Sequence, residues 1–189
     1  MNKLNSVIVL TLLIGVTYVN YKSFKSSPFQ AALLDDWNKQ SYRLPLDLIE
    51  EVDLDFPNIT PTTIPLKLLK GRYYKNMDSI DLALDYYHQS LKINPYLKIV
   101  ESQLSLLYYD IEDYDSAYYY GKDAFLFYPN NNVHRHAYFQ SLVKKRDSTE
   151  LDRSFELIRN KQNESHWIEY ILSKRSISKK YSKEIDSLM

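Results

Sequence analysis

The hydrophobic pattern begins with one long apolar segment at the amino terminus. Residues 4–21 carry no charge, and Tyr18 and Tyr21 near the end of this segment are followed by Lys22 and Lys25. About 18 residues with a rise of 1.5 Å each form a helix of about 27 Å, close to the ~30 Å hydrocarbon core of a bilayer. Tyrosines and lysines at such an end are typical of a membrane interface. We therefore predict a membrane anchor over residues 4–21.

Two alternatives to the anchor stay open at this point, a cleaved signal peptide and a buried helix of a soluble protein. The residues after the apolar segment do not form a small-x-small cleavage pattern, and the segment is apolar on every face. Lys3 on one side and Lys22 and Lys25 on the other leave the positive-inside count nearly tied. The short tail before Lys3 favours a cytoplasmic amino terminus, and therefore a single-pass protein with an extracytoplasmic body.

After the anchor, apolar residues recur at the spacing of amphipathic helices. Residues 79–93 place one apolar stripe on a helix, made of Ile80, Ala83, Leu84, Tyr87 and Leu91. Similar segments predict antiparallel helix pairs at 65–75 with 79–93, at 96–109 with 114–128, and, less regularly, at 133–145 with 149–159. Thr62 or Thr63, Asp78 and Asp113 are the expected amino-terminal caps.

Less regular segments flank these pairs. Residues 26–60 are expected to form a degenerate helix pair, 28–40 with 45–52, which closes at Phe56-Pro57. Residues 164–189 are expected to form a capping helix and a basic tail. The apolar stripe of this helix consists of Trp167, Ile168, Ile171 and Leu172. From Lys174 onward the chain is basic and is expected to fray, although Tyr181, Ile185 and Leu188 could extend the capping helix. The basic residues are interpreted as a solvated tail or as a contact for anionic lipid or an acidic partner.

The chain repeats itself at a fixed interval. When residues 64–97 are aligned with residues 98–131, identical or small residues coincide: Tyr74 with Tyr108, Ala83 with Ala117, Ser90 with Ala124, and Pro95 with Pro129. The two prolines lie 34 positions apart, which is the period of the tetratricopeptide repeat. Small residues allow helices to cross closely, and a proline ends the second helix of each pair.

This spacing resembles the tetratricopeptide repeat family over residues 61–162, with units at 64–97 and 98–131 and a degenerate unit at 132–162. The resemblance implies an all-α fold, a right-handed superhelical array of antiparallel helix pairs. Some motif positions depart from the family pattern. Gly71 matches it but Ser105 does not, Tyr87 matches it but Gly121 does not, and Lys67 and Glu101 replace the tryptophan.

In this family the first helix of each pair lines a groove that binds protein partners. The resemblance implies that the groove is lined by Leu68, Arg72, Lys75, Asn76, Ile99, Ser102, Leu106, Tyr109, Asp110, His136, Gln140 and Lys144. Position in the repeat nominates these residues, rather than their chemistry. The lysine and asparagine pattern with which cochaperones hold a carboxyl terminus is not reproduced, so we do not predict binding of chaperone tails.

Composition and motifs argue against catalysis. Lys+Arg and Asp+Glu are both 24, so no overall charge attracts nucleic acid, and cysteine is absent. No nucleophile elbow, phosphate-binding loop or dinucleotide fingerprint occurs. His134 and His136 lie about 200° apart on a helix, and the acidic run from Asp110 to Asp115 lacks the glycine and final glutamate of a calcium loop. We expect no enzyme activity, cofactor or metal.

A second resemblance is more restricted. The stretches I-P-L-K-L-L-K-G-R-Y-Y, Asn94-Pro95-Tyr96 and Y-P-N-N-N-V-H are similar to the helical repeat tails of some bacterial O-antigen ligase and polymerase proteins. This resemblance implies an accessory role in envelope polysaccharide assembly. We therefore predict a membrane-anchored scaffold of a bacterial inner membrane that binds a protein partner in a membrane complex and does not bind nucleic acid. The alternative is an extracytoplasmic module that binds glycan or peptidoglycan.

Overall fold

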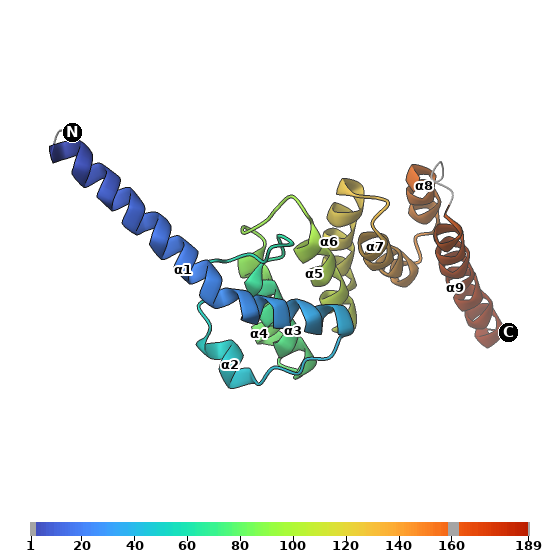
Figure 1. The fold of residues 1–189 in the computed structure, drawn as a ribbon. Helices are drawn as coiled ribbons and strands as arrows, with labels where there is room; N and C mark the ends of the chain where they lie inside the picture. The colour runs from blue at the N-terminus through green and yellow to red at the C-terminus, as the bar shows by residue number, and fades with distance from the viewer. Residues whose placement is uncertain (1–2, 159–162, 189) are drawn as a thin grey trace. The chain divides into compact units, whose positions relative to one another are not determined.

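The computed structural model describes residues 3–158 and 163–188, and in these ranges every regular element is a helix. The chain divides into two compact units, Met1–Asn94 and Pro95–Met189. The first contains α1 (Lys3–Lys39), α2 (Leu46–Glu51), α3 (Leu66–Asn76) and α4 (Ile80–Ser90). The second contains α5 (Ile99–Asp110), α6 (Tyr114–Phe127), α7 (Asn132–Lys145), α8 (Ser148–Ile158) and α9 (Glu164–Leu188) (Figure 1). The predicted all-α class is thus confirmed.

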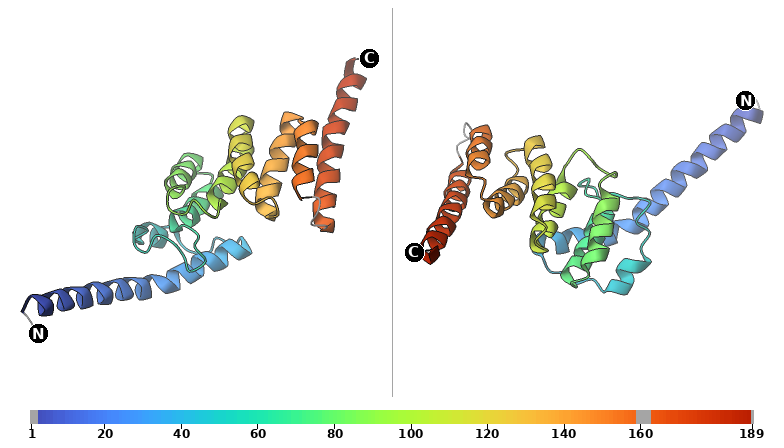
Figure 2. Two further views of the ribbon diagram at one scale, coloured as in Figure 1. Left: turned by 90° about the horizontal axis from the view of Figure 1, so that it is seen from above. Right: turned by 180° about the vertical axis from the view of Figure 1, so that it is seen from behind.

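Helix α1 joins the apolar segment to the first unit without a break (Figures 1 and 2). Its amino-terminal half is exposed and, among the described residues, α1 is the helix that is long and apolar enough to cross a membrane. Its carboxyl-terminal half places Leu33 in the core of the first unit, with Phe29 and Trp37 packed against that core. The apolar anchor segment and the folded unit therefore share one helix.

Residues 28–40 were expected to form a separate helix, but residues 28–39 belong to α1, and this prediction is wrong. Pro28 lies inside α1 and does not begin a helix. A proline removes one N–H donor from the helical ladder, and this loss is tolerated where water replaces the missing bond. Pro28 is exposed. The backbone carbonyl that would accept from the N–H at position 28 belongs to Phe24, which is also exposed. The second helix of the predicted pair, expected at residues 45–52, is the six-residue helix α2.

The first unit has its own core, which lies between the end of α1, α2 and α3. It consists of Leu33, Ile49, Leu54, Leu66, Leu69 and Tyr73. The second unit has a core in which α6, α7, α8 and α9 meet. It consists of Phe125, Tyr138, Phe139, Leu142, Leu151, Phe155, Ile158 and Ile177. These cores show how each group of amphipathic helices hides its apolar stripe from water.

A left-handed backbone residue ends the first helix of each pair. Asp78, Glu112 and Arg146 have φ angles of 60°, 65° and 57°, and successive members are 34 residues apart (112 − 78 and 146 − 112). The next residue always donates its N–H to a carbonyl five positions back, from Ser79 to Tyr74, Asp113 to Tyr108 and Asp147 to Leu142, at 2.9–3.0 Å. The same turn thus recurs three times, including in the pair that was least regular in sequence.

Two departures from the repeat pattern explain each other. In the first unit a Cβ at position 71 would lie 2.7 Å from the Tyr87 ring, so Gly71 makes room for that tyrosine. In the second unit the large and small residues are reversed: a Cβ at position 121 would lie 2.7 Å from Oγ of Ser105. Positions 71 and 105 are equivalent, as are 87 and 121. In the pair α3–α4 the larger of the two facing side chains comes from α4, and in the pair α5–α6 it comes from α5.

The helix caps were predicted only in part. Asp113 is confirmed as the cap of α6, because its side chain accepts from the backbone N–H of Ser116 at 3.1 Å. Helix α3 instead begins after Pro65, with no side-chain cap, and Ser79 rather than Asp78 precedes α4. Asn131, which was not predicted, caps α7 by accepting from the N–H groups of Val133 and His134.

Helix α9 also differs from the expectation. It continues through the basic segment to Leu188, where a frayed tail was expected. Ile177 is buried in the core of the second unit, and Tyr170 packs against that core. The stripe expected to cap the array is at least 40% exposed at each of its members, Trp167, Ile168, Ile171 and Leu172. The helix thus caps the second unit with a different face.

Candidate functional site

The predicted groove residues of the first unit fall into different environments. Leu68 is fully buried in the unit, so it is unavailable to a partner. Arg72 is held by the end of α1 and the following turn: its guanidinium lies 4.0 Å from the centre of the Trp37 ring and donates to the Tyr42 hydroxyl at 2.8 Å. It also donates to the Gln40 side chain. Arg72 therefore binds within the unit, whereas Lys75 and Asn76 lie at the exposed end of α3.

These contacts predict the result of a substitution. We expect Arg72→Glu to destabilise the first unit, because it removes the cation from Trp37 and Tyr42 and places a carboxylate beside aromatic faces. Cation–π contacts and hydrogen bonds from a charged donor support a loss of about 1–3 kcal/mol. Urea unfolding of the full chain in detergent, followed by Trp37 fluorescence in a Trp167→Phe background, measures this loss. The control is Asn76→Ala at the exposed end of the same helix, for which we expect a change below about 0.5 kcal/mol.

In the second unit, the structure brings together two of the predicted groove residues. Tyr109 at the end of α5 and Lys144 at the end of α7 meet beside Tyr114, the first residue of α6. The Lys144 ammonium lies 5.3 Å from the centre of the Tyr109 ring and 4.9 Å from that of Tyr114, and it donates to the Tyr114 hydroxyl at 3.2 Å. This hydrogen bond raises the pKa of Lys144, so the side chain is cationic at neutral pH.

A second group with the same chemistry continues this surface. The Tyr118 ring has the ammonium of Lys122 at 5.3 Å and that of Lys145 at 5.2 Å from its centre. We call the combined set the lysine–tyrosine surface: Tyr109, Tyr114, Tyr118, Lys122, Lys144 and Lys145. Tyr114, Tyr118 and Lys122 were not nominated from the sequence. Their spacing of four residues on α6 places them on one helix face, and this signal could have identified them.

The three lysines of this surface differ in how their charge is balanced. Lys122 pairs with Glu150 at 3.1 Å, and Lys145 pairs with Asp115. The direct contacts of Lys144 are with tyrosines instead, and the carboxylate of Glu112 acts on it only as a weaker electrostatic neighbour. Lys144 is therefore the cation of the lysine–tyrosine surface that is best placed to attract an external carboxylate. The arrangement suits binding, because the tyrosine rings hold the ammonium group without neutralising it.

The other predicted groove residues of the second unit do not join this surface as a set. Ser102 is buried, and its hydroxyl donates to the Ile99 carbonyl at 2.9 Å. Ile99, Leu106 and Gln140 are half-buried, and Asp110 is exposed beyond Tyr109. His136 accepts or donates a bond of 3.0 Å with Glu169 of α9, so it lies in the contact between α7 and α9. Repeat position alone therefore does not identify a continuous binding surface.

The α7–α9 contact contains several ionisable groups. Arg135 and His136 of α7 both bind the Glu169 carboxylate, and His166 of α9 is buried beside them. Burial favours the neutral acid of Glu169, but hydrogen bonds from His136 and Arg135 outweigh it and lower its pKa. Burial lowers the pKa of His166, and the nearby Arg135 charge lowers it further. Burial likewise lowers the pKa of His134.

These shifts predict that mild acid weakens the second unit. A histidine with a lowered folded pKa is neutral in both states at high pH, and the unfolded state binds the proton first as the pH falls through about 6.5. We therefore expect the melting temperature followed by Trp167 fluorescence to fall between pH 7.5 and 5.5. The variant His166→Gln should flatten this dependence. An unchanged slope in that variant would show that His166 does not contribute.

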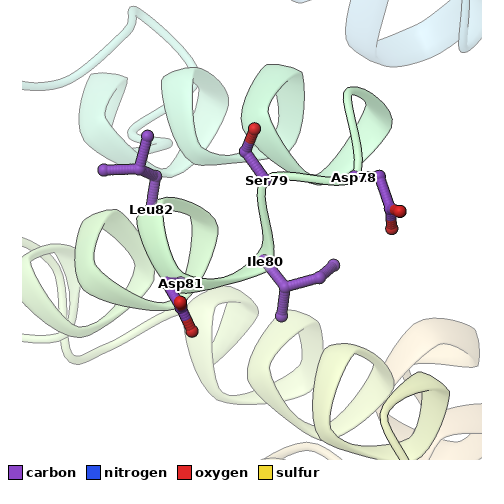
Figure 3. A pocket seen from close by; sticks show the side chains of 5 residues that line it. All are labelled: Asp78, Ser79, Ile80, Asp81 and Leu82. Carbon is purple, nitrogen blue, oxygen red and sulfur yellow. The ribbon is translucent and has the colours of Figure 1, made fainter.

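The two histidines considered for metal binding face different surroundings. His134 is buried, whereas the side chain of His136 is 53% exposed and contacts Glu169. Within the described residues, no group of three histidine or acidic side chains could hold a metal ion. A surface pocket lies in the first unit at the turn between α3 and α4, lined by Asp78, Ser79, Ile80, Asp81 and Leu82. Figure 3 shows that these side chains point in different directions, so they do not converge on a ligand.

Comparisons with known proteins do not assign the chain to a group. No protein-family model, no curated protein and no solved structure matches the sequence. The function is therefore inferred from the residues and contacts of the chain itself, above all those of the lysine–tyrosine surface.

Proposed function

We propose that the protein is a membrane-anchored scaffold of tetratricopeptide-like helix pairs that binds a protein partner through the lysine–tyrosine surface. The observation that carries this proposal is the turn at Asp78, Glu112 and Arg146, which recurs at 34-residue intervals with the same backbone hydrogen bond. A recurring turn between paired helices is what a right-handed superhelical array requires. The apolar half of α1 supports the anchor.

The chemistry of the surface supports an acidic partner segment. Lys144 carries a charge that its tyrosine neighbours do not neutralise, and the half-buried rings of Tyr109 at the end of α5 and Tyr114 at the start of α6 provide aromatic area around it. Tyrosine is enriched at protein interfaces, and a cation at the edge of such an area attracts a partner of opposite charge. The ammonium groups of Lys122 and Lys145 already form ion pairs, and Lys122 donates to the Tyr118 hydroxyl, so these groups support binding rather than catalysis.

The glycan-binding alternative would use the same tyrosines as stacking platforms for sugar rings. The ring of Tyr109 already contacts Lys144 and lies 5.8 Å from the ring of Tyr114. These contacts occupy part of the area that a sugar would need, which favours a protein partner. Placement in a bacterial inner membrane with an extracytoplasmic body, and an accessory role in envelope polysaccharide assembly, stay predictions from the sequence.

A matched pair of charge reversals tests the proposed surface. We expect Lys144→Glu to reduce at least tenfold the recovery of a partner crosslinked to the full chain in its native membranes, because a carboxylate would repel an acidic segment. Arg175→Glu on the exposed part of α9 changes the net charge equally and should leave recovery unchanged. Recovery is measured by quantitative mass spectrometry, and circular dichroism checks that both variants are folded.

Two results of this experiment would contradict the proposal. Equal recovery with Lys144→Glu and the wild-type chain would exclude this surface as the binding site. Binding of an oligosaccharide that is lost in Tyr109→Ala would instead support the glycan-binding module.

A further inference from the structure

Helix α1 constrains how the first unit meets the bilayer. The apolar segment ends at Tyr21, and eleven residues after Lys22 the same helix places Leu33 in the core of the first unit. A helix rises 1.5 Å per residue, so Lys22 and Leu33 are separated by only about 17 Å along its axis. Parts of the first unit that pack beside Lys22 therefore lie close to the depth at which the apolar segment ends.

The loop after α2 is held at this depth by one carboxylate. Oδ2 of Asp53 pairs with the Lys22 ammonium at 2.8 Å. Oδ1 of the same group accepts from the backbone N–H of Asp55 at 3.0 Å and from that of Phe56 at 3.3 Å. Leu54, in the middle of this turn, is buried in the core of the first unit. The turn is thus fixed both to α1 and to the core.

This turn presents an exposed aromatic side chain beside an exposed part of α1. Phe56 is 41% exposed, and Phe24, about 3 Å further along the helix than Lys22, is 78% exposed. Lysines lie on the same segments or pair with the turn: Lys22 pairs with Asp53, Lys25 lies over the Tyr21 ring at 5.4 Å, and Lys67 pairs with the exposed Asp55 at 2.9 Å. Aromatic rings with nearby lysines are typical of the region between lipid headgroups and acyl chains.

We propose that the Asp53–Pro57 turn is a second membrane contact, in which Phe56 enters the interfacial region of the bilayer beside α1. The inference rests on the membrane anchor in the proposed function. The bilayer is the occupant that the structure favours, because the helix that carries the anchor also carries Lys22, which positions the turn. The ion pair between Lys22 and Asp53 fixes the depth of Phe56, and the buried Leu54 limits its movement away from α1.

Single cysteines can test this contact, because the natural chain contains none. The full-length variants Leu13→Cys, Phe24→Cys, Phe56→Cys and Asn38→Cys would be labelled with an environment-sensitive fluorophore and placed in lipid nanodiscs. Asn38 is an exposed residue of α1, about 24 Å beyond Lys22 along the helix, and serves as the water reference. Leu13, in the middle of the apolar segment, serves as the lipid reference.

We expect the label at position 56 to be blue-shifted to the value found at position 24 and clearly separated from the value at position 38. Adding Asp53→Ala to Phe56→Cys should move its emission towards the water reference. A label at position 56 that matches position 38, while position 13 reports lipid, would overturn the second contact and leave the anchor intact. A water-exposed label at position 13 would overturn the anchor itself. Unchanged shielding with Asp53→Ala would overturn the role assigned to Asp53.

Discussion

Replacing Asp36 with alanine is expected to destabilise the first unit by about 3–5 kcal/mol, the largest effect of a single substitution that we predict. Asp36 is 2% exposed, near the carboxyl end of α1. Its carboxylate accepts hydrogen bonds from the Tyr73 and Ser41 hydroxyls, from the Arg43 side chain, and from the backbone N–H groups of Arg43 and Leu44. Removing it leaves these donors without their common acceptor.

The ionisation of Asp36 indicates how strongly these donors act. Burial raises the pKa of a carboxyl group, but the hydrogen bonds from Tyr73, Ser41 and Arg43 outweigh burial and hold the pKa of Asp36 well below its ordinary value. A carboxyl group with a lowered folded pKa stabilises the folded state above the unfolded pKa near 4, and this stability is lost as the pH falls towards the folded value. The effect of the substitution should therefore be full at neutral pH.

Asp35 provides the control for this prediction. It neighbours Asp36 in sequence, but its side chain is 40% exposed and pairs with Lys39 and Arg43 at the surface. We expect Asp35→Ala to cost less than about 1 kcal/mol. Urea unfolding of the full chain in detergent, followed by Trp37 fluorescence in a Trp167→Phe background, measures both free energies. Equal losses in the two variants would show that the buried hydrogen bonds of Asp36 add nothing.

The second large effect is expected at Gly121, where α6 approaches α7. A Cβ at this position would lie 2.7 Å from Oγ of Ser105 and 3.1 Å from the backbone Cα of Tyr138. Alanine favours a helix over glycine by about 1 kcal/mol, whereas overpacking costs about 1–3 kcal/mol. Tyr138 is fully buried, and its backbone cannot move without shifting α7. We therefore expect a net loss of up to about 2 kcal/mol in Gly121→Ala.

Two variants make the Gly121 prediction specific. Gly15→Ala is the matched control, because a Cβ at position 15 meets nothing within 4 Å. It should not destabilise the second unit. Adding Ser105→Gly to Gly121→Ala removes the contact with Oγ but keeps the contact with the α7 backbone, so stability should return only in part. Unfolding followed by Trp167 fluorescence measures these changes, and a Gly121→Ala chain at least as stable as wild type would contradict the close packing of α6 and α7.

Features that depend on residues close together in the chain were predicted from the sequence. Apolar periodicity predicted a helix at each repeat position, and the Asp113 cap was evident from the residues around it. The turns at Asp78, Glu112 and Arg146 were missed, because left-handed residues are usually recognised by glycine and none of these is glycine. Their regular interval appears only in the backbone.

The candidate site was predicted less well than the fold. Tyr109 and Lys144 were nominated from repeat positions, and the structure brings them into contact. Tyr114 and Tyr118 were missed, since they lie on the second helix of a pair, where the groove was not expected. Arg72 was nominated as a groove residue, but the end of α1 binds it. Its contacts join residues at least 30 positions apart, and repeat position carries no information about them.

By itself, the sequence determined the helical class, the apolar amino-terminal segment and the 34-residue spacing, because these follow from the order of apolar, small and helix-ending residues along the chain. Only the tertiary structure decided that α1 continues through Pro28, that Gly71 and Tyr87 exchange sizes with Ser105 and Gly121, and which lysines lie over tyrosine rings. These features depend on which side chains share space after folding. Packing and burial select among partners that are distant in sequence, and a local pattern does not specify them.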